Sequence, residues 1–123
     1  MLESIQFPNT IEPTTGDIFD ECNKLETIQI IGSNSMKDYS STNQPWNTIM
    51  SKIKTVKLGS EITTIGNYAF TSATGLQTIT WNSIITTIGS HSFEGCSSLL
   101  SLSLPSTVTE VKSYGFNGCS NMK

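Results

Sequence analysis

The residues of this chain that could hold a metal ion lie near its single histidine, His91. Glu94 and Cys96 follow it within five positions. A protein zinc site needs three or four ligands, and these three side chains do not make up a recognised ligand set. We therefore interpret His91 as a surface turn residue, and we expect no metal site.

Covalent catalysis is the second chemistry to consider, and the sequence does not support it. Ser120–Lys123 matches the pattern S-x-x-K, but the companion motifs of the serine enzymes that use it are missing. The ten acidic residues show no paired spacing, and the sequence contains no G-x-S-x-G, P-loop or G-x-G-x-x-G motif. We predict that the chain is not an enzyme and uses no cofactor.

Three cysteines, Cys22, Cys96 and Cys119, each follow a phenylalanine by three residues. The three cysteines thus occupy the same position in their repeats, which is typical of a small buried apolar side chain. Cys96 and Cys119 could come within disulfide range on adjacent repeats, but stacked side chains point the same way and keep their sulfurs apart. We therefore predict free thiols.

The charge and hydropathy of the chain exclude two kinds of partner. Its net charge is −3 and its seven basic residues are all lysine. Because arginine is the preferred side chain for phosphate and guanine, we predict no nucleic-acid binding. No apolar run reaches the length of a membrane span, so we expect no membrane insertion in this segment. Residues 1–13 lack the features of a secretion signal, and we expect any such signal to lie outside this sequence.

The elements that position these residues repeat every 23 residues. In each of the last three units an aliphatic residue is followed by apolar residues three, five, nine and twelve positions on, and by a phenylalanine at seventeen. In the last unit these are Leu99, Leu102, Leu104, Val108, Val111 and Phe116. We predict one domain, residues 1–123, with units at 2–24, 25–52, 53–75, 76–98 and 99–121, of which the second is expanded. Met122 begins a sixth unit, so we expect this to be a piece of a longer array.

Each unit predicts a short strand followed by a return limb. One strand cannot bury its own apolar face, so we expect the strands of successive units to stack into a parallel sheet. We expect the return limb to form short strands, 3₁₀ turns or short helical turns. It should also present Phe70, Phe93 and Phe116 inward as a column of rings, one per repeat.

These units resemble the BspA-like leucine-rich repeat. The resemblance lies in the elements L-x-x-I-x-L-P, V-x-x-I-G and A-F-x-x-C, as in LLSLSLPSTVTEVKSYGFNGC at residues 99–119, and it covers essentially the whole chain. Lys112 stands in place of the glycine and Ala73 in place of the cysteine, which are variations in packing. The resemblance implies an α/β leucine-rich-repeat solenoid, of a kind found in surface proteins that serve as adhesins or recognition proteins.

The outward positions of the predicted strands form the candidate partner-binding face. One column contains Gln6, Gln29, Lys57, Thr80 and Ser103, and the column beside it includes Thr55 and Thr78. These side chains are small and polar, so the face is either a contact surface or a solvated sheet rich in strand-forming residues. We also predict that Glu26 and Lys54 pair across adjacent strands.

The expanded unit carries a polar loop at residues 32–44, which is the second candidate surface. Met36 and Tyr39 are its large side chains, and we predict that both are exposed and available to a partner. We expect Trp46, with Ile49 and Met50, to take the place of the missing phenylalanine in the core.

The leading hypothesis is a non-catalytic binding module for a protein or another cell-surface macromolecule, located at the cell surface or secreted, as the resemblance implies. The alternative is an intracellular scaffold for protein–protein interaction in the cytoplasm, which the free thiols favour. A spacer without a ligand is a third reading. We also expect the chain to pair end to end, because a stacked array exposes apolar residues and unpaired backbone groups at each end.

Overall fold

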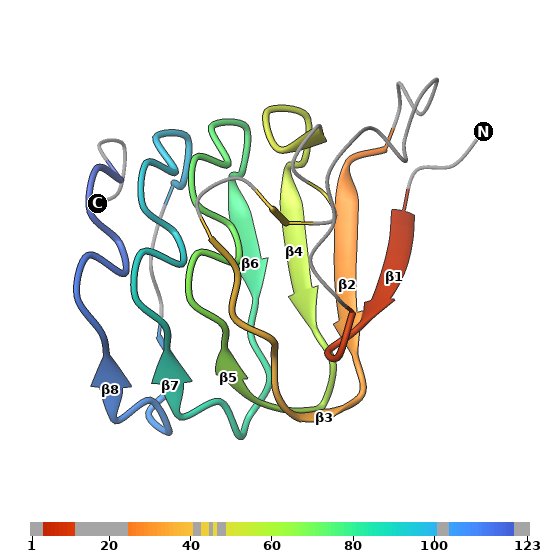
Figure 1. The fold of residues 1–123 in the computed structure, drawn as a ribbon, viewed down its shortest axis with the longest axis vertical. Helices are drawn as coiled ribbons and strands as arrows, with labels where there is room; N and C mark the ends of the chain where they lie inside the picture. Colours follow the sequence, from red (N-terminus) through yellow and green to blue (C-terminus); the bar gives the residue numbers. More distant parts are fainter. Residues whose placement is uncertain are drawn as a thin grey trace.

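The computed structural model describes residues 4–11, 25–40, 43, 44, 46, 49–100 and 104–119. The strands in these residues are β1 (Ser4–Pro8), β2 (Thr27–Ile31), β3 (Ser33–Ser35), β4 (Thr55–Leu58), β5 (Glu61–Ile65), β6 (Thr78–Thr80), β7 (Thr87–Ile88) and β8 (Glu110–Val111). Strands β1, β2, β4 and β6 form one sheet in that order, and β3, β5, β7 and β8 form a second. Figure 1 shows both sheets running along the molecule, with each strand beside its counterpart in the neighbouring repeat.

Both sheets are parallel, and their register follows the period of the sequence. In the first sheet the residues opposite one another include Ser4, Thr27, Thr55 and Thr78. They are 23, 28 and 23 positions apart. Parallel strands need a long connection between them, and the remainder of each repeat supplies it.

The strands of both sheets bury their aliphatic residues in a common core. In β2, Ile28 and Ile30 are fully buried, whereas Gln29 between them is partly exposed. In the second sheet, Ile62 and Ile65 of β5 are also fully buried. The alternation in β2 follows from the two-residue period of a strand, which places successive side chains on opposite faces.

A column of aromatic rings runs through the core, as the sequence predicted. Trp46 stacks on Phe70, with ring centroids 5.3 Å apart. Phe70 stacks on Phe93 at 5.5 Å, and Phe93 stacks on Phe116 at 5.3 Å. Trp46 is fully buried and its indole N–H donates a hydrogen bond to the carbonyl of Ala69, so the prediction that it replaces the missing phenylalanine is confirmed.

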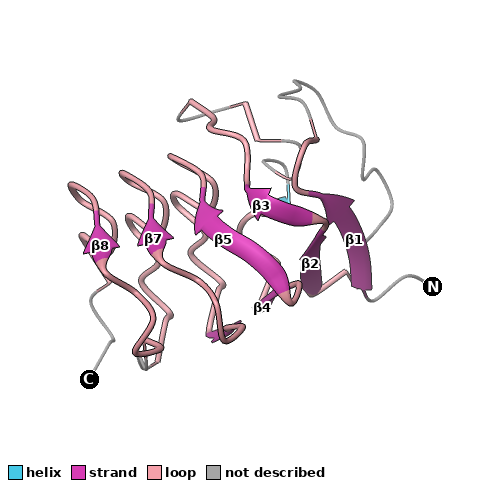
Figure 2. Cartoon of the chain, turned by 90° about the horizontal axis from the view of Figure 1, so that it is seen from below, coloured by secondary structure: helices cyan, strands magenta, loops and turns pink. Residues whose placement is uncertain are grey.

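The return limbs consist of turns and short strands. Strands β5, β7 and β8 lie on these limbs, and in the described residues the helical character is limited to a 3₁₀ turn at Ile49 (Figure 2). The segments around the phenylalanines do not form continuous helices, because alternate backbone N–H groups bond to the next repeat. The N–H of Tyr68 donates to the carbonyl of Ser90, and that of Phe70 donates to Ser92. In the described part of the chain, no helix is long and apolar enough to cross a membrane.

Candidate partner-binding surfaces

The first sheet brings the predicted outward residues together in one column. Gln6 lies opposite Gln29, Gln29 opposite Lys57, and Lys57 opposite Thr80. Gln29 is half-buried and the other three are exposed, whereas Ser103 lies outside the described residues. In the neighbouring column, Thr55 and Thr78 lie opposite one another. We refer to these residues as the strand face.

Neighbouring side chains of the first sheet interact across its rungs. The amide of Gln6 donates a hydrogen bond of 3.1 Å to Gln29. The ammonium of Lys54 lies 3.0 Å from the carboxylate of Glu26, so the predicted cross-strand pair is confirmed. Lys57 has no ion-pair partner among the described residues. The strand face therefore offers neutral hydrogen-bonding groups around one unpaired positive charge.

The prediction that Met36 and Tyr39 are exposed is wrong. Their relative exposures are 5% and 6%. The Tyr39 hydroxyl donates a hydrogen bond of 2.7 Å to the carbonyl of Ile11, and its ring packs edge-on against Trp46. The backbone N–H of Met36 donates to the carbonyl of Thr64. Met36 and Tyr39 therefore anchor this part of the loop to the repeats. Their side chains lie in the core because they bury more apolar area there than they would in solvent.

A second row of rings, which the sequence analysis missed, lies along the return limbs. His91 stacks on Tyr68, with centroids 4.6 Å apart, and on Tyr114, with centroids 4.9 Å apart. We call these three residues the ladder. Each stands two residues before a phenylalanine of the core column. This shared position in three successive repeats was the feature of the sequence that could have predicted the ladder. The prediction that His91 lies in a turn is confirmed.

All three ladder residues have a left-handed backbone, with φ values of 59° for Tyr68, 56° for His91 and 60° for Tyr114. This conformation costs a residue with a side chain roughly 1–2 kcal/mol. An aromatic pair returns roughly 0.5–1.5 kcal/mol beyond the area it buries. Stacking therefore offsets part of the backbone cost of the ladder.

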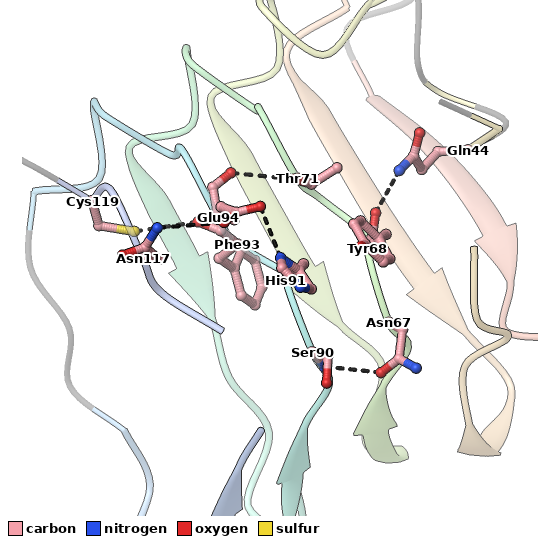
Figure 3. Close-up of polar contacts among 10 residues, drawn as sticks. All are labelled: Gln44, Asn67, Tyr68, Thr71, Ser90, His91, Phe93, Glu94, Asn117 and Cys119. Atoms are coloured by element: carbon pink, nitrogen blue, oxygen red, sulfur yellow. Dashed lines mark hydrogen bonds and ion pairs between the residues drawn. The ribbon is translucent and has the colours of Figure 1, made fainter. Parts of the chain in front are cut away.

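Glu94 fixes the orientation of the central ring of the ladder. Its carboxylate lies 2.9 Å from Nδ1 of His91, and it also accepts a 3.4 Å hydrogen bond from the amide of Asn117 (Figure 3). The hydrogen bond to His91 is the main reason that the pKa of Glu94 lies below its ordinary value. Because an ionised carboxylate only accepts hydrogen bonds, Nδ1 of a neutral His91 carries the proton, and Nε2 is left as an acceptor.

The two cysteines that the structure describes are free thiols, as predicted. Cys96 is fully buried and Cys119 is partly buried. Each thiol donates to a carbonyl of the preceding repeat, Cys96 to Phe70 and Cys119 to Phe93, at 3.3 Å. Burial raises the pKa of Cys96 to about 12 and also raises the pKa of Cys119. Both thiols therefore serve as small packing groups, and Cys22 lies outside the described residues.

Comparison with known families and structures agrees with the repeat. The family profile described as the BspA type leucine-rich repeat region matches residues 1–123 in six copies. The crystal structure of a leucine-rich repeat protein of T. pallidum is similar, with a TM-score of 0.52 and 16% sequence identity. The match covers 98% of this chain and 62% of that chain, so this chain spans about three fifths of that protein's length. No curated protein sequence matches this chain. At this identity the structural likeness shows the fold alone, and together with the parallel sheets it supports the leucine-rich-repeat fold expected from the sequence.

Proposed function

This chain belongs to the BspA-type leucine-rich repeat family, and from that premise we propose that it is a protein-binding module that acts in adhesion or recognition at a cell surface. The observation that carries the proposal is the strand face. Its exposed polar residues Gln6, Lys57 and Thr80 lie in register on three different repeats.

Several features of the strand face support a role in binding. Repeat proteins bind partners through extended surfaces that several repeats build together. Strands in a sheet are spaced about 4.8 Å apart, so the side chains of one column are close enough to contact the same partner. Around Lys57 the face supplies amide and hydroxyl groups that donate and accept hydrogen bonds. A partner with a carboxylate near Lys57 would be complementary to this arrangement.

The test of the cell-surface role is accessibility on intact cells. An antibody against the chain, or an added protease, should reach the protein on unpermeabilised source cells. Detection only after permeabilisation would contradict the adhesion proposal.

The strand face is tested by reversing its one unpaired charge. We expect Lys57→Glu to weaken binding of the purified chain to intact target cells by at least about tenfold, or about 1.4 kcal/mol. Lys112→Glu is the matched control, because Lys112 is also exposed but follows β8 of the other sheet. Equal losses in the two variants would indicate non-specific attraction by charge. Full binding by the Lys57 variant would exclude the strand face as the contact surface.

An intracellular scaffold is the second candidate, and the free thiols of Cys96 and Cys119 favour it. Disulfides are common in secreted proteins and rare in the reducing cytosol. The accessibility experiment distinguishes the two candidates, because a scaffold inside the cell would be detected only after permeabilisation. Its partner would then be sought with the same pair of lysine variants.

A further inference from the structure

The edge of the ladder carries a row of hydrogen-bonding groups that have no hydrogen-bond partner among the residues that the structure describes. Within the described residues, the hydroxyls of Tyr68 and Tyr114 and the Nε2 atom of His91 make no hydrogen bond. Tyr114 is 59% exposed, whereas Tyr68 and His91 are partly exposed. The rings that carry these polar groups are stacked, with neighbouring centroids 4.6 and 4.9 Å apart.

Every group in this row can accept a hydrogen bond. Nε2 of a neutral His91 accepts, since Nδ1 faces the carboxylate of Glu94. Each tyrosine hydroxyl has lone pairs that accept. A carboxylate can accept about four hydrogen bonds, and Glu94 receives two, from His91 and Asn117. Its side chain is 32% exposed, so the remaining lone pairs are within reach of a partner.

The stacking within the ladder bears on which ligand it can bind. Both faces of His91 are covered by tyrosine rings, and each tyrosine has one face against His91. A sugar that stacks on the His91 ring would therefore have to displace a tyrosine. A donor-rich group can instead approach the edge, where the acceptors lie.

The residues beside the ladder have the composition of a protein-binding surface. Ser113 and Asn117 are exposed, and Ser90 and Asn67 are partly exposed. Surfaces rich in tyrosine, serine and asparagine combine rigid amphipathic rings with adaptable hydrogen bonding.

We propose that the surface formed by Tyr68, His91, Glu94, Tyr114 and Asn117 binds an arginine-bearing segment of a partner protein. A guanidinium carries five donors in a planar fork and pairs with carboxylates in two-pronged geometry. Glu94 provides the charge, and the row of acceptors provides further hydrogen bonds for the same segment. This surface is separate from the strand face, so the two proposals can fail independently.

The probe for this surface is a short peptide with two arginines, acetyl-Ser-Arg-Gly-Arg-Ser-amide, titrated into the isotope-labelled chain and followed by backbone amide NMR. The comparison peptide has citrulline in place of arginine and so keeps the shape without the charge. We expect shifts concentrated at the five residues of the surface, and at least fivefold weaker binding of the citrulline peptide. Shifts spread over other exposed carboxylates such as Glu26 and Glu61, equal effects of the two peptides, or no shifts would overturn the proposal.

Two variants connect the binding to the surface. Glu94→Gln keeps an acceptor for His91 but removes the charge, and it should reduce affinity for the arginine peptide about fivefold. Tyr114→Ala removes the exposed ring at one end of the ladder and should also weaken binding. Glu61→Gln is the matched control, because Glu61 is an exposed carboxylate on β5 outside this surface, and it should bind like the parent. Loss of binding in the control, or full binding by Glu94→Gln, would contradict the proposal. Shifts at the ladder with an uncharged oligosaccharide such as cellopentaose, but not with the arginine peptide, would identify a carbohydrate surface instead.

Discussion

Replacing Phe93 with alanine removes an interior ring of the aromatic column. Phe93 is fully buried and stacks between Phe70 and Phe116, and Trp81 packs edge-on against it with centroids 6.2 Å apart. Each repeat of a stacked array contacts only its neighbours, so the loss of this ring weakens the packing of one repeat against the repeat before it and the repeat after it. The variant therefore tests whether the column holds successive repeats together.

The cost can be worked out from two contributions. Truncating a buried phenylalanine to alanine costs roughly 3–5 kcal/mol, which includes the cavity that remains. Aromatic pairs are worth roughly 0.5–1.5 kcal/mol beyond their buried area, and Phe93 takes part in three of them. We therefore expect a loss near the upper end of the range, about 4–5 kcal/mol. Phe93→Leu retains most of the volume but loses the ring pairs, and it should cost about 1.5–3 kcal/mol.

Urea unfolding measures both variants, with tryptophan fluorescence and far-UV circular dichroism as independent probes. Trp46 lies in the column and Trp81 contacts Phe93, so fluorescence reports on this part of the core. Leu100→Ala is the control, since Leu100 is 56% exposed and its removal should change stability by no more than about 0.5 kcal/mol. A loss below about 2 kcal/mol for Phe93→Ala, or a loss for Phe93→Leu no larger than that of the Leu100→Ala control, would refute the stacking argument.

Four further predictions concern ionisable groups. A double-mutant cycle on Glu26 and Lys54 should give a coupling below about 1 kcal/mol that falls with added salt, because both side chains are 53% exposed; a larger, salt-independent value would contradict this. At neutral pH the folded chain should leave Cys96 unlabelled by an alkylating reagent and label Cys119 slowly, with rapid labelling of both in urea. Burial raises the pKa of Cys96 from 9.0 to about 12, so the thiol loses its proton at lower pH in the unfolded chain than in the folded one. Its contribution to stability is therefore present below pH 9 and is lost between pH 9 and 12. Cys96→Ala should flatten the profile of stability against pH in this range. The pKa of Glu94 is lowered on folding, so its contribution has the opposite sign: it is present above the unfolded pKa and lost on acidification, and Glu94→Gln should reduce that loss of stability.

The features that sequence predicted correctly are those that repeat. The strand residues and the core phenylalanines recur at fixed positions, so stacking the units in register places each one beside its counterpart. The position of Trp46 in the core was predicted as well, although the expanded unit breaks the spacing. Trp46 is the large apolar ring that follows the polar loop, and it stacks on Phe70 of the next unit. The pairing of Glu26 with Lys54 follows from the same register.

Local chemistry misled the prediction for the expanded loop. Gly, Ser, Asn and Asp dominate residues 32–44, and such composition is typical of exposed loops. Met36 and Tyr39 stand out in that segment because they are apolar, and apolar side chains in a polar loop can anchor it to the core as well as project from it. The sequence contains no periodic signal that separates these outcomes, since the loop occurs once.

The ladder shows the limit of assessing a residue alone. His91 was interpreted by itself, and a single histidine in a turn suggests no function. The repeat, however, places Tyr68 and Tyr114 at equivalent positions one unit before and one unit after it, so the register of the sheets implies three stacked rings. What register alone does not give is the left-handed backbone of all three residues. In a stacked array, therefore, candidate binding residues are best sought as columns across repeats. A column of aromatic rings at the surface whose backbone is strained is a stronger candidate than a column of residue types that strands favour for their own stability.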